Sequence, residues 1–166
     1  PPPGSRFANP HFFERLEDDI QRLKRKHAAA CFVIVGDRNA RTGSFSEYAA
    51  AECRDQLHAG TQNDPGVFLP RCSRDSVING YGRELLSFCR RNDLIIMNGR
   101  GRDPHGDFTY VTGTGNSVVD YAVVSDSLFY SDPNAFSTIP TLLTKHHPIS
   151  FRLPQKPNRK SSGTVS

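Results

Sequence analysis

Asp37 and Asn39 stand two residues apart, directly after the apolar run Cys31–Val35 and a glycine. A carboxylate can take up a proton from water, and a carboxamide both donates and accepts hydrogen bonds. The pair therefore suits the work of polarising a water molecule and holding a phosphate oxygen. The same residue types are also frequent in turns, where they bond to the backbone. The two residues alone leave both interpretations open.

A second carboxylate, Asp120, lies within the apolar run Val118–Val124. Strand alternation places it on the same face as the valine and alanine residues at even positions, which predicts a buried face. A buried carboxylate is costly unless it is hydrogen-bonded, so Asp120 requires a partner. The partner could be a set of backbone amides that Asp120 ties down. It could also be a histidine.

The candidate histidine is His146, in the cluster Thr144–Ile149 with His147 beside it. A carboxylate behind a histidine fixes the tautomer and the orientation of the ring and stabilises the imidazolium form. Adjacent histidines can equally be exposed loop residues. The need of Asp120 for a donor, and the strand predicted just after Pro148, favour His146 as its partner.

Short strands are predicted to carry these side chains. The run at 31–35 has no polar residue and predicts a strand buried on both faces, and 94–97 predicts a second buried strand. The runs 108–112 and 117–124 flank a turn sequence and predict a β-hairpin. Residues 149–153 predict a last strand.

Two helices are predicted beside these strands. Asn9 and Pro10 are typical of a helix start, and apolar residues recur at helical spacing over 12–23. Asn79 is typical of the cap of a second helix, whose apolar side chains lie at 85–89. Helices alternating with buried strands indicate a layered α/β fold.

Residues 40–78 show little periodicity and contain several glycines and prolines. We expect an irregular excursion with a short helix near Tyr48–Leu57. Long segments of this kind are either functional loops or locally disordered, and the sequence leaves both possibilities open.

Composition limits the class of protein. The chain has 166 residues, which suits one compact domain, and a net charge of +4, which permits a polyanionic partner. No apolar run reaches membrane-spanning length, so we expect an intracellular protein, nuclear or cytoplasmic and not secreted, without a membrane partner. The four cysteines lack CxxC spacing, so no zinc site or disulfide is predicted, and Cys31 and Cys89 are expected in the core.

Three ordered signatures resemble the endonuclease/exonuclease/phosphatase superfamily: Gly36-Asp37-x-Asn39, Val118-Val119-Asp120-Tyr121 and His146-x-Pro148-Ile149. The segments 79–89, 98–100 and 106–109 are more similar still to the endonuclease domain of LINE-type (non-LTR) retrotransposons and of host proteins derived from them. The resemblance covers residues 10–153. It leaves residues 1–9 as a disordered start and 154–166 as a disordered basic tail or linker.

The resemblance implies a two-sheet α/β sandwich with flanking helices in four layers, and a DNA-nicking enzyme that hydrolyses phosphodiesters with Mg²⁺ or Mn²⁺. It implies that Asp37 positions or deprotonates the attacking water and contacts the metal, while Asn39 holds a phosphate oxygen. It further implies that Asp120 orients His146, whose protonated ring stabilises the pentacovalent phosphate.

The resemblance also implies partners. The loop Gly113–Ser117 would approach the nucleic acid, with Asn116 and Ser117 as contact residues. The partner would be DNA, and a reverse transcriptase domain would belong to the same parent polypeptide.

Two departures from the family pattern weaken the expectation of activity. The chain resembles only the second part of the domain, without the N-terminal half that supplies a metal-binding glutamate. Lys145 occupies the position of a family acidic residue, and Arg38 adds a second positive charge, so we expect metal binding to be weakened or lost. The alternatives are a catalytically inactive remnant, a domesticated module that binds nucleic acid or protein, and, less favoured, a superfamily phosphatase.

Overall fold

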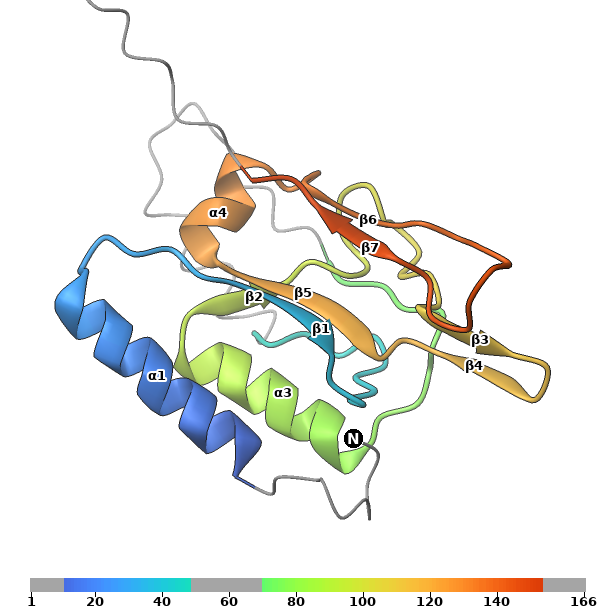
Figure 1. The fold of residues 1–166 in the computed structure, drawn as a ribbon, viewed down its shortest axis with the longest axis horizontal. Helices are drawn as coiled ribbons and strands as arrows, with labels where there is room; N and C mark the ends of the chain where they lie inside the picture. The colour runs from blue at the N-terminus through green and yellow to red at the C-terminus, as the bar shows by residue number, and fades with distance from the viewer. Residues whose placement is uncertain (1–10, 49–69, 154–166) are drawn as a thin grey trace, which may run out of the picture.

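The computed structural model describes residues 11–48 and 70–153, which form helices and antiparallel sheets of a general α/β class (Figure 1). The predicted disordered ends, the Asn9-Pro10 helix start and all of the predicted 48–57 helix except Tyr48 lie outside these residues. No helix within them is long and apolar enough to cross a membrane. The elements are α1 (Phe12–Lys26), β1 (Val33–Asp37), α3 (Gly80–Arg91), β2 (Leu94–Ile96), β3 (Tyr110–Thr112), β4 (Gly115–Ser117), β5 (Asp120–Ser125), α4 (Asp126–Ser131), β6 (Phe136–Thr138) and β7 (Ile149–Phe151).

The central sheet has the strand order β1-β5-β2 and is antiparallel throughout. Val124 of β5 lies in the middle, opposite Val33 of β1 and Ile95 of β2. The prediction that 31–35 is buried on both faces is wrong, because 46% of Val35 is exposed. Among the described strands, β1 pairs on one side only, so it lies at the edge of the sheet and is covered less than β5.

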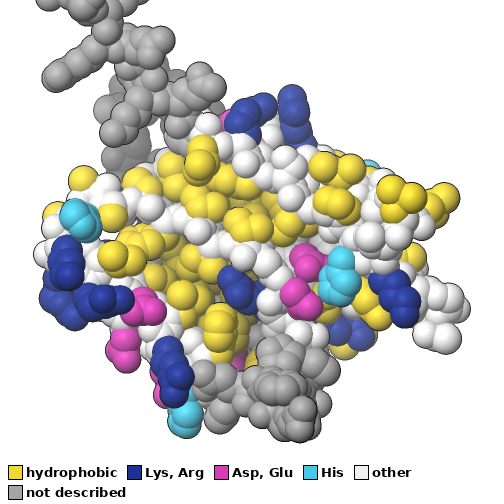
Figure 2. All heavy atoms as spheres, in the orientation of Figure 1, with side chains coloured by type: hydrophobic (Ala, Val, Ile, Leu, Met, Phe, Trp, Pro, Cys, Tyr) yellow, Lys and Arg dark blue, Asp and Glu magenta, His cyan; other side chains and the backbone are white. Residues whose placement is uncertain are grey.

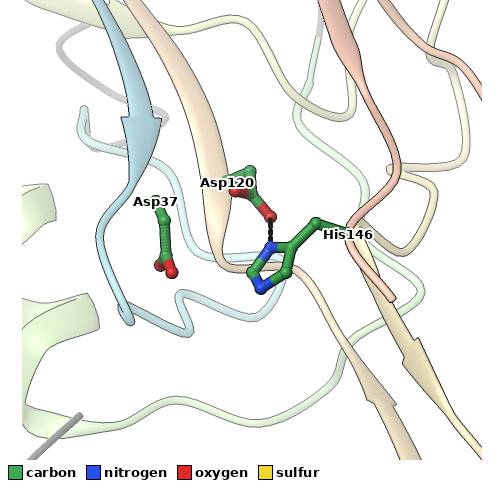
Figure 3. Close-up of side chains that lie close together, drawn as sticks. All are labelled: Asp37, Asp120 and His146. Atoms are coloured by element: carbon green, nitrogen blue, oxygen red, sulfur yellow. Dashed lines mark hydrogen bonds and ion pairs between the residues drawn. The ribbon is translucent and has the colours of Figure 1, made fainter. Parts of the chain in front are cut away.

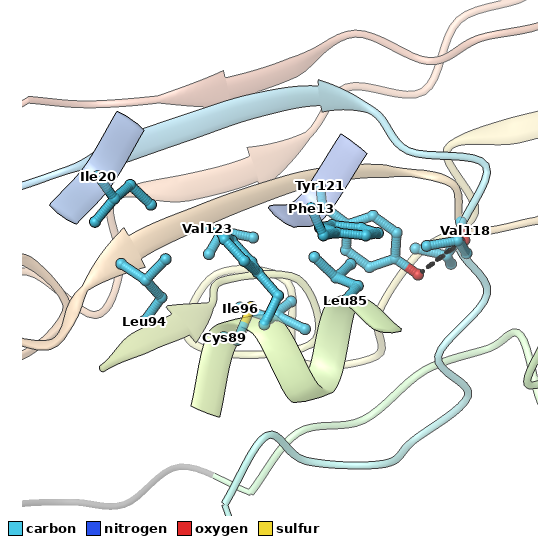
Figure 4. Close-up of a cluster of buried hydrophobic side chains, with 11 residues drawn as sticks. Phe13, Ile20, Leu85, Cys89, Leu94, Ile96, Val118, Tyr121 and Val123 are labelled. Carbon is cyan, nitrogen blue, oxygen red and sulfur yellow. Dashed lines mark hydrogen bonds between the residues drawn. The ribbon is translucent and has the colours of Figure 1, made fainter. Parts of the chain in front are cut away.

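Helices α1 and α3 cover one face of this sheet, and α4 with the β6–β7 pair covers the other (Figure 1). Each face carries its own apolar cluster. On the helical face, Phe13 of α1 packs against Phe88 of α3 with the ring centroids 5.4 Å apart. Figure 4 shows how Leu85, Ile96 and Val123 fill the space between helix and sheet. The burial of apolar side chains on both faces is what makes β5 the rigid centre of the fold.

The second helix begins as predicted. The Asn79 side chain accepts a hydrogen bond of 2.7 Å from the Gly82 N–H, which caps α3. Helix α1 begins at Phe12 after His11, whose side chain makes no capping bond. Cys89 on α3 is buried as expected, whereas Cys31 is exposed because it precedes β1 and lies outside the sheet.

A hairpin is present, with β3 paired to β4, but its second strand is 115–117 and not the predicted 117–124, because Gly115 and Asn116 pair with β3 instead of forming the turn. The run 117–124 divides, since β4 ends at Ser117 and β5 begins at Asp120 in the central sheet. Val118 consequently packs on the helical face, while Ala122 and Val124 pack on the opposite one. Alternation across the whole run therefore did not hold, because the chain crosses from one sheet to another at its start. The strand at 94–97 is present as β2, and β7 occupies 149–151; β6 and α4 were not predicted.

Buried arginines organise the described parts of the irregular segment, 40–48 and 70–79. The Arg100 guanidinium forms an ion pair of 2.7 Å with Glu47, and both side chains are at most 1% exposed. Arg71 donates to the Gly43 carbonyl at 2.9 Å, the Phe45 carbonyl at 2.7 Å and the Asn98 carbonyl at 3.1 Å. These bonds satisfy backbone groups that would otherwise be buried without partners. The described parts of this segment are therefore held in a defined conformation by these buried bonds.

Candidate active site

Asp37 and Asp120 lie directly opposite each other in the central sheet. Asp37 is the last residue of β1, Asp120 is the first residue of β5, and the antiparallel register pairs them. Side chains of directly opposed residues project from the same face, so both carboxylates emerge together at one end of the sheet. Figure 3 shows them with His146.

His146 reaches these carboxylates from the connection between β6 and β7. Its Nδ1 lies 3.0 Å from Asp120 Oδ2, and one ligand atom from each of the three residues lies within 4.8 Å of the others. A carboxylate can only accept, so Nδ1 carries the proton and donates, which leaves Nε2 as the second functional atom of the ring. The predicted contact between Asp120 and His146 is present.

The cluster is open to solvent. The His146 side chain is 47% exposed and the Asp120 side chain 13%, and Asp37 is exposed. Asp120 is thus less buried than the strand pattern predicted. Figure 2 shows acidic side chains and a histidine side by side on this face, next to an apolar surface. A substrate can therefore reach all three groups.

The segment that carries His146 is held as an extra strand beside β3. Val111 N–H donates to the Lys145 carbonyl at 2.8 Å, and His147 N–H donates to the Thr109 carbonyl at 2.7 Å. His146 itself bridges to Tyr110 in this pairing. Because side chains alternate along an extended segment, His146 turns toward the carboxylates while its two neighbours turn away.

The adjacent histidines differ in what their rings contact. The Tyr110 ring lies against the His146 ring, with centroids 4.8 Å apart. The His147 ring donates from Nδ1 to the Phe108 carbonyl at 3.0 Å, since a carbonyl oxygen can only accept. His147 is therefore a backbone anchor, and His146 is the histidine that faces the cluster.

Asn39 sits in a turn after Asp37, with a positive φ of 48°. Its N–H donates to Asp37 Oδ1 at 2.8 Å, and its carbonyl accepts from Asn79 Nδ2 at 3.0 Å. Within the described residues, this N–H is the one donor to the Asp37 carboxylate. The turn interpretation is thus correct for this pair, and it leaves the second oxygen of Asp37 available for chemistry.

Asp75 joins the loop after Asp37 to the start of β5, and the sequence analysis missed it. Its carboxylate accepts two bonds from Arg41, at 2.7 and 2.8 Å, and one from the Val118 N–H at 3.1 Å. Burial alone would raise the pKa of Asp75, but Arg41 and the backbone N–H groups of Val118 and Val77 together lower it. An acid in an aperiodic stretch offered no periodic signal, so its role follows only from the fold.

Asn98 fixes the other side of Asp120 and was also missed as a site residue. This fully buried side chain donates to the Asp120 carbonyl at 3.0 Å and accepts from the Ala122 N–H at 3.1 Å. Asn98 thereby fixes the backbone at the start of β5. A polar residue directly after a buried strand, as in 94–97, is the signal that could have indicated it.

Among the described residues, neither Lys145 nor Arg38 forms an ion pair with the cluster. Lys145 lines a groove together with Tyr110 and His147. The Arg38 guanidinium lies 5.3 Å from the centroid of the Phe12 ring on α1. Burial lowers the pKa of Arg38, and the charge of Asp37 partly offsets this effect.

Asn116 and Ser117 lie on β4 of the hairpin and outside the cluster. Ser117 is paired with Tyr110, whose ring contacts His146, and Asn116 is exposed. The hairpin extends beyond the end of the central sheet on which the cluster lies (Figure 1). Ser117 therefore adjoins the site through Tyr110, whereas Asn116 lies farther along the hairpin.

Within residues 11–48 and 70–153, this cluster is the group of histidine and acidic side chains that could hold a metal ion. Asp37 offers an exposed carboxylate, which suits a hard cation such as Mg²⁺. Asp120 already accepts from His146, and imidazole is a poor ligand for Mg²⁺. The cluster thus offers one uncommitted carboxylate, which by itself would hold an ion only weakly. Exposed acidic groups also gather without any metal, so the cluster is a candidate only.

No protein-family model matches the chain, and the comparison with curated proteins found no match either.

Proposed function

We propose that the chain derives from an endonuclease of retrotransposon type and that Asp37, Asn39, Asp120 and His146 hydrolyse a DNA phosphodiester. The observation that carries this proposal is the convergence of Asp37, Asp120 and His146, three residues from separate segments, with ligand atoms within 4.8 Å of one another. Such a combination of an exposed base and an oriented acid is what in-line attack by water on a phosphate requires.

Each residue has a distinct task in this proposal. Asp37 uses its available oxygen to orient and deprotonate the attacking water. His146, with Nδ1 held by Asp120, presents Nε2 to a phosphate oxygen and in its protonated form stabilises the charge of the pentacovalent phosphate. Asn39 holds another phosphate oxygen. Asp120 keeps the histidine in one tautomer and one orientation.

Mg²⁺ or Mn²⁺ is the proposed cofactor, with Asp37 as its ligand. When bound, such an ion neutralises phosphate charge and acts as a Lewis acid. The small donor set leads us to propose that affinity for the ion is low and rises when the substrate phosphate is present.

We further propose that the described residues form one part of a two-sheet sandwich. Two observations support this: β1 lies at the edge of its sheet, and Val35 remains 46% exposed on it. An exposed apolar edge strand is unfavourable in an isolated domain and becomes favourable when another layer covers it. The covering layer and a reverse transcriptase would then belong to the same parent polypeptide.

The test is nicking of supercoiled plasmid DNA in Mg²⁺ and, separately, in Mn²⁺. His146→Ala should lower the nicking rate by about 10²-fold or more, because a general acid and charge stabiliser is lost. His105→Ala is the matched control, since His105 is exposed and should leave the rate unchanged. An inert wild type in both metals, or equal rates for wild type and His146→Ala, would refute the proposal.

A second candidate is a module that binds nucleic acid without cleaving it. Lys145 favours it, because this cation adjoins His146 in the chain where the family carries an acid. Lys145→Asp distinguishes the two: a gain of nicking would show a cleavage site disabled by one charge, and continued binding without nicking would support the module.

A further inference from the structure

A groove separates the β3–β4 hairpin from the connection between β6 and β7. Its volume is about 1060 Å³, slightly above the range of about 300–1,000 Å³ typical of ligand sites. The two walls are held at a fixed distance because Val111 N–H donates to the Lys145 carbonyl at 2.8 Å. In Figure 1 the 139–148 connection runs beside the hairpin.

The groove adjoins the cluster of Asp37, Asp120 and His146 through Tyr110. This tyrosine lines the groove, and its ring also lies 4.8 Å from the ring of His146, centroid to centroid. A strand that placed a phosphate at His146 would therefore have the groove beside it.

The lining of the groove combines three kinds of chemistry. Leu142 and Leu143 supply apolar surface and are 104% and 92% exposed, so they pack on nothing among the described residues. Threonine residues line both walls, although the hydroxyls of Thr112, Thr141 and Thr144 bond to the backbone, and Lys145 contributes a single positive charge. No acidic side chain of the described residues lines it. The threonine residues are Thr112, Thr114, Thr141 and Thr144.

We propose that this groove binds unpaired nucleotides of the strand adjoining the scissile phosphate. The flat face of a base suits the exposed apolar leucines, and Lys145 suits a phosphate. Bases within a duplex have both faces stacked on their neighbours, so only unpaired bases can place a face on Leu142 and Leu143. This inference rests on the proposed function, since it names the substrate of the same site, and it gives Lys145 a task in binding.

The experiment measures fluorescence anisotropy of a short labelled single-stranded oligodeoxynucleotide and of the matching blunt duplex, in EDTA. Chelation removes hydrolysis, so the result is independent of whether the chain cleaves DNA. Lys145→Gln should weaken single-strand binding about fivefold at about 0.1 M salt and reduce the salt slope by about 0.7, the value for one phosphate contact. Lys26→Gln is the matched control, because Lys26 is an exposed lysine on α1.

A second variant tests the apolar wall. Leu142→Ser combined with Leu143→Ser should weaken binding of the single strand more than binding of the duplex. Both side chains are exposed, so far-UV circular dichroism should show an unchanged fold. Equal binding of single strand and duplex, or an unaffected double variant, would overturn the proposal. So would a double variant that changes only self-association in sedimentation, which would assign the leucines to a protein contact.

Discussion

Among the described residues, two groups of acidic and basic side chains differ sharply in their exposure to solvent. Glu47 and Arg100 form an ion pair whose side chains are at most 1% exposed. Asp120 and His146 form a pair in which the histidine is 47% exposed, with Asp37 beside it. The first cluster is closed by further bonds to the backbone, whereas the second is open, with Asp37 also exposed.

The difference shows how the fold separates support from chemistry. Glu47 also accepts from the Ile96 N–H at 3.0 Å, so its charge is fully compensated inside the protein. A buried charge without its partner is very unfavourable, so both members of this ion pair are needed for the stability of the fold. The open cluster carries two carboxylates directly opposed across two strands, an arrangement that costs stability. We expect a substitution in the closed cluster to lower the free energy of unfolding strongly, and a substitution in the open cluster to change it little.

The largest effect is expected at the closed cluster. Arg100→Met leaves Glu47 buried without its cation and should lower the free energy of unfolding by about 3–5 kcal/mol. Urea denaturation followed by circular dichroism measures this change. Arg83→Met, an exposed arginine on α3, is the control and should change it by less than about 0.5 kcal/mol. A small loss of unfolding free energy for Arg100→Met would show that the ion pair does not stabilise the fold as proposed.

An intermediate effect is expected at Asp75, which joins the loop after Asp37 to β5. Asp75→Asn removes the ion pair with Arg41 and should cost about 2–3 kcal/mol. The folded pKa of Asp75 is lowered, so its contribution is present above the ordinary aspartate pKa of about 3.9 and is lost as pH falls through the folded value.

The acid limb of the stability profile provides the measurement for this residue. Wild type should lose stability below about pH 4 more steeply than Asp75→Asn. Asp18→Asn, at an exposed position of α1, should retain the wild-type slope. Parallel acid limbs for wild type and Asp75→Asn would contradict the assigned charge state.

The smallest effect, and one of opposite sign, is expected in the open cluster. Asp37→Asn removes one of two opposed like charges and should raise the free energy of unfolding by about 0.2–1 kcal/mol. The same variant should abolish nicking, because the carboxamide cannot accept the proton of water. Thermal unfolding and plasmid nicking on one preparation measure both. A loss of stability would show that the Asp37 charge supports the fold.

Parts of both the fold and the site were predictable because they depend on short segments. The Asn79 cap and the β3–β4 hairpin follow from local backbone chemistry, and both are present. The contact between Asp120 and His146, which are 26 residues apart, was one of two alternatives that the cost of an unpaired carboxylate left open, and the structure shows it. The prediction that 31–35 is buried on both faces was wrong, because an apolar run does not reveal whether its strand lies at the centre or the edge of a sheet.

The sequence by itself determined which residue types could do chemistry and where the local turns and caps form. The tertiary structure decided which of them meet. The register of β1 against β5 places Asp37 opposite Asp120, and the pairing of 145–147 with β3 turns His146 rather than His147 toward them. The physical reason is that register and alternation are set by hydrogen bonds between segments distant in sequence, which local patterns do not encode.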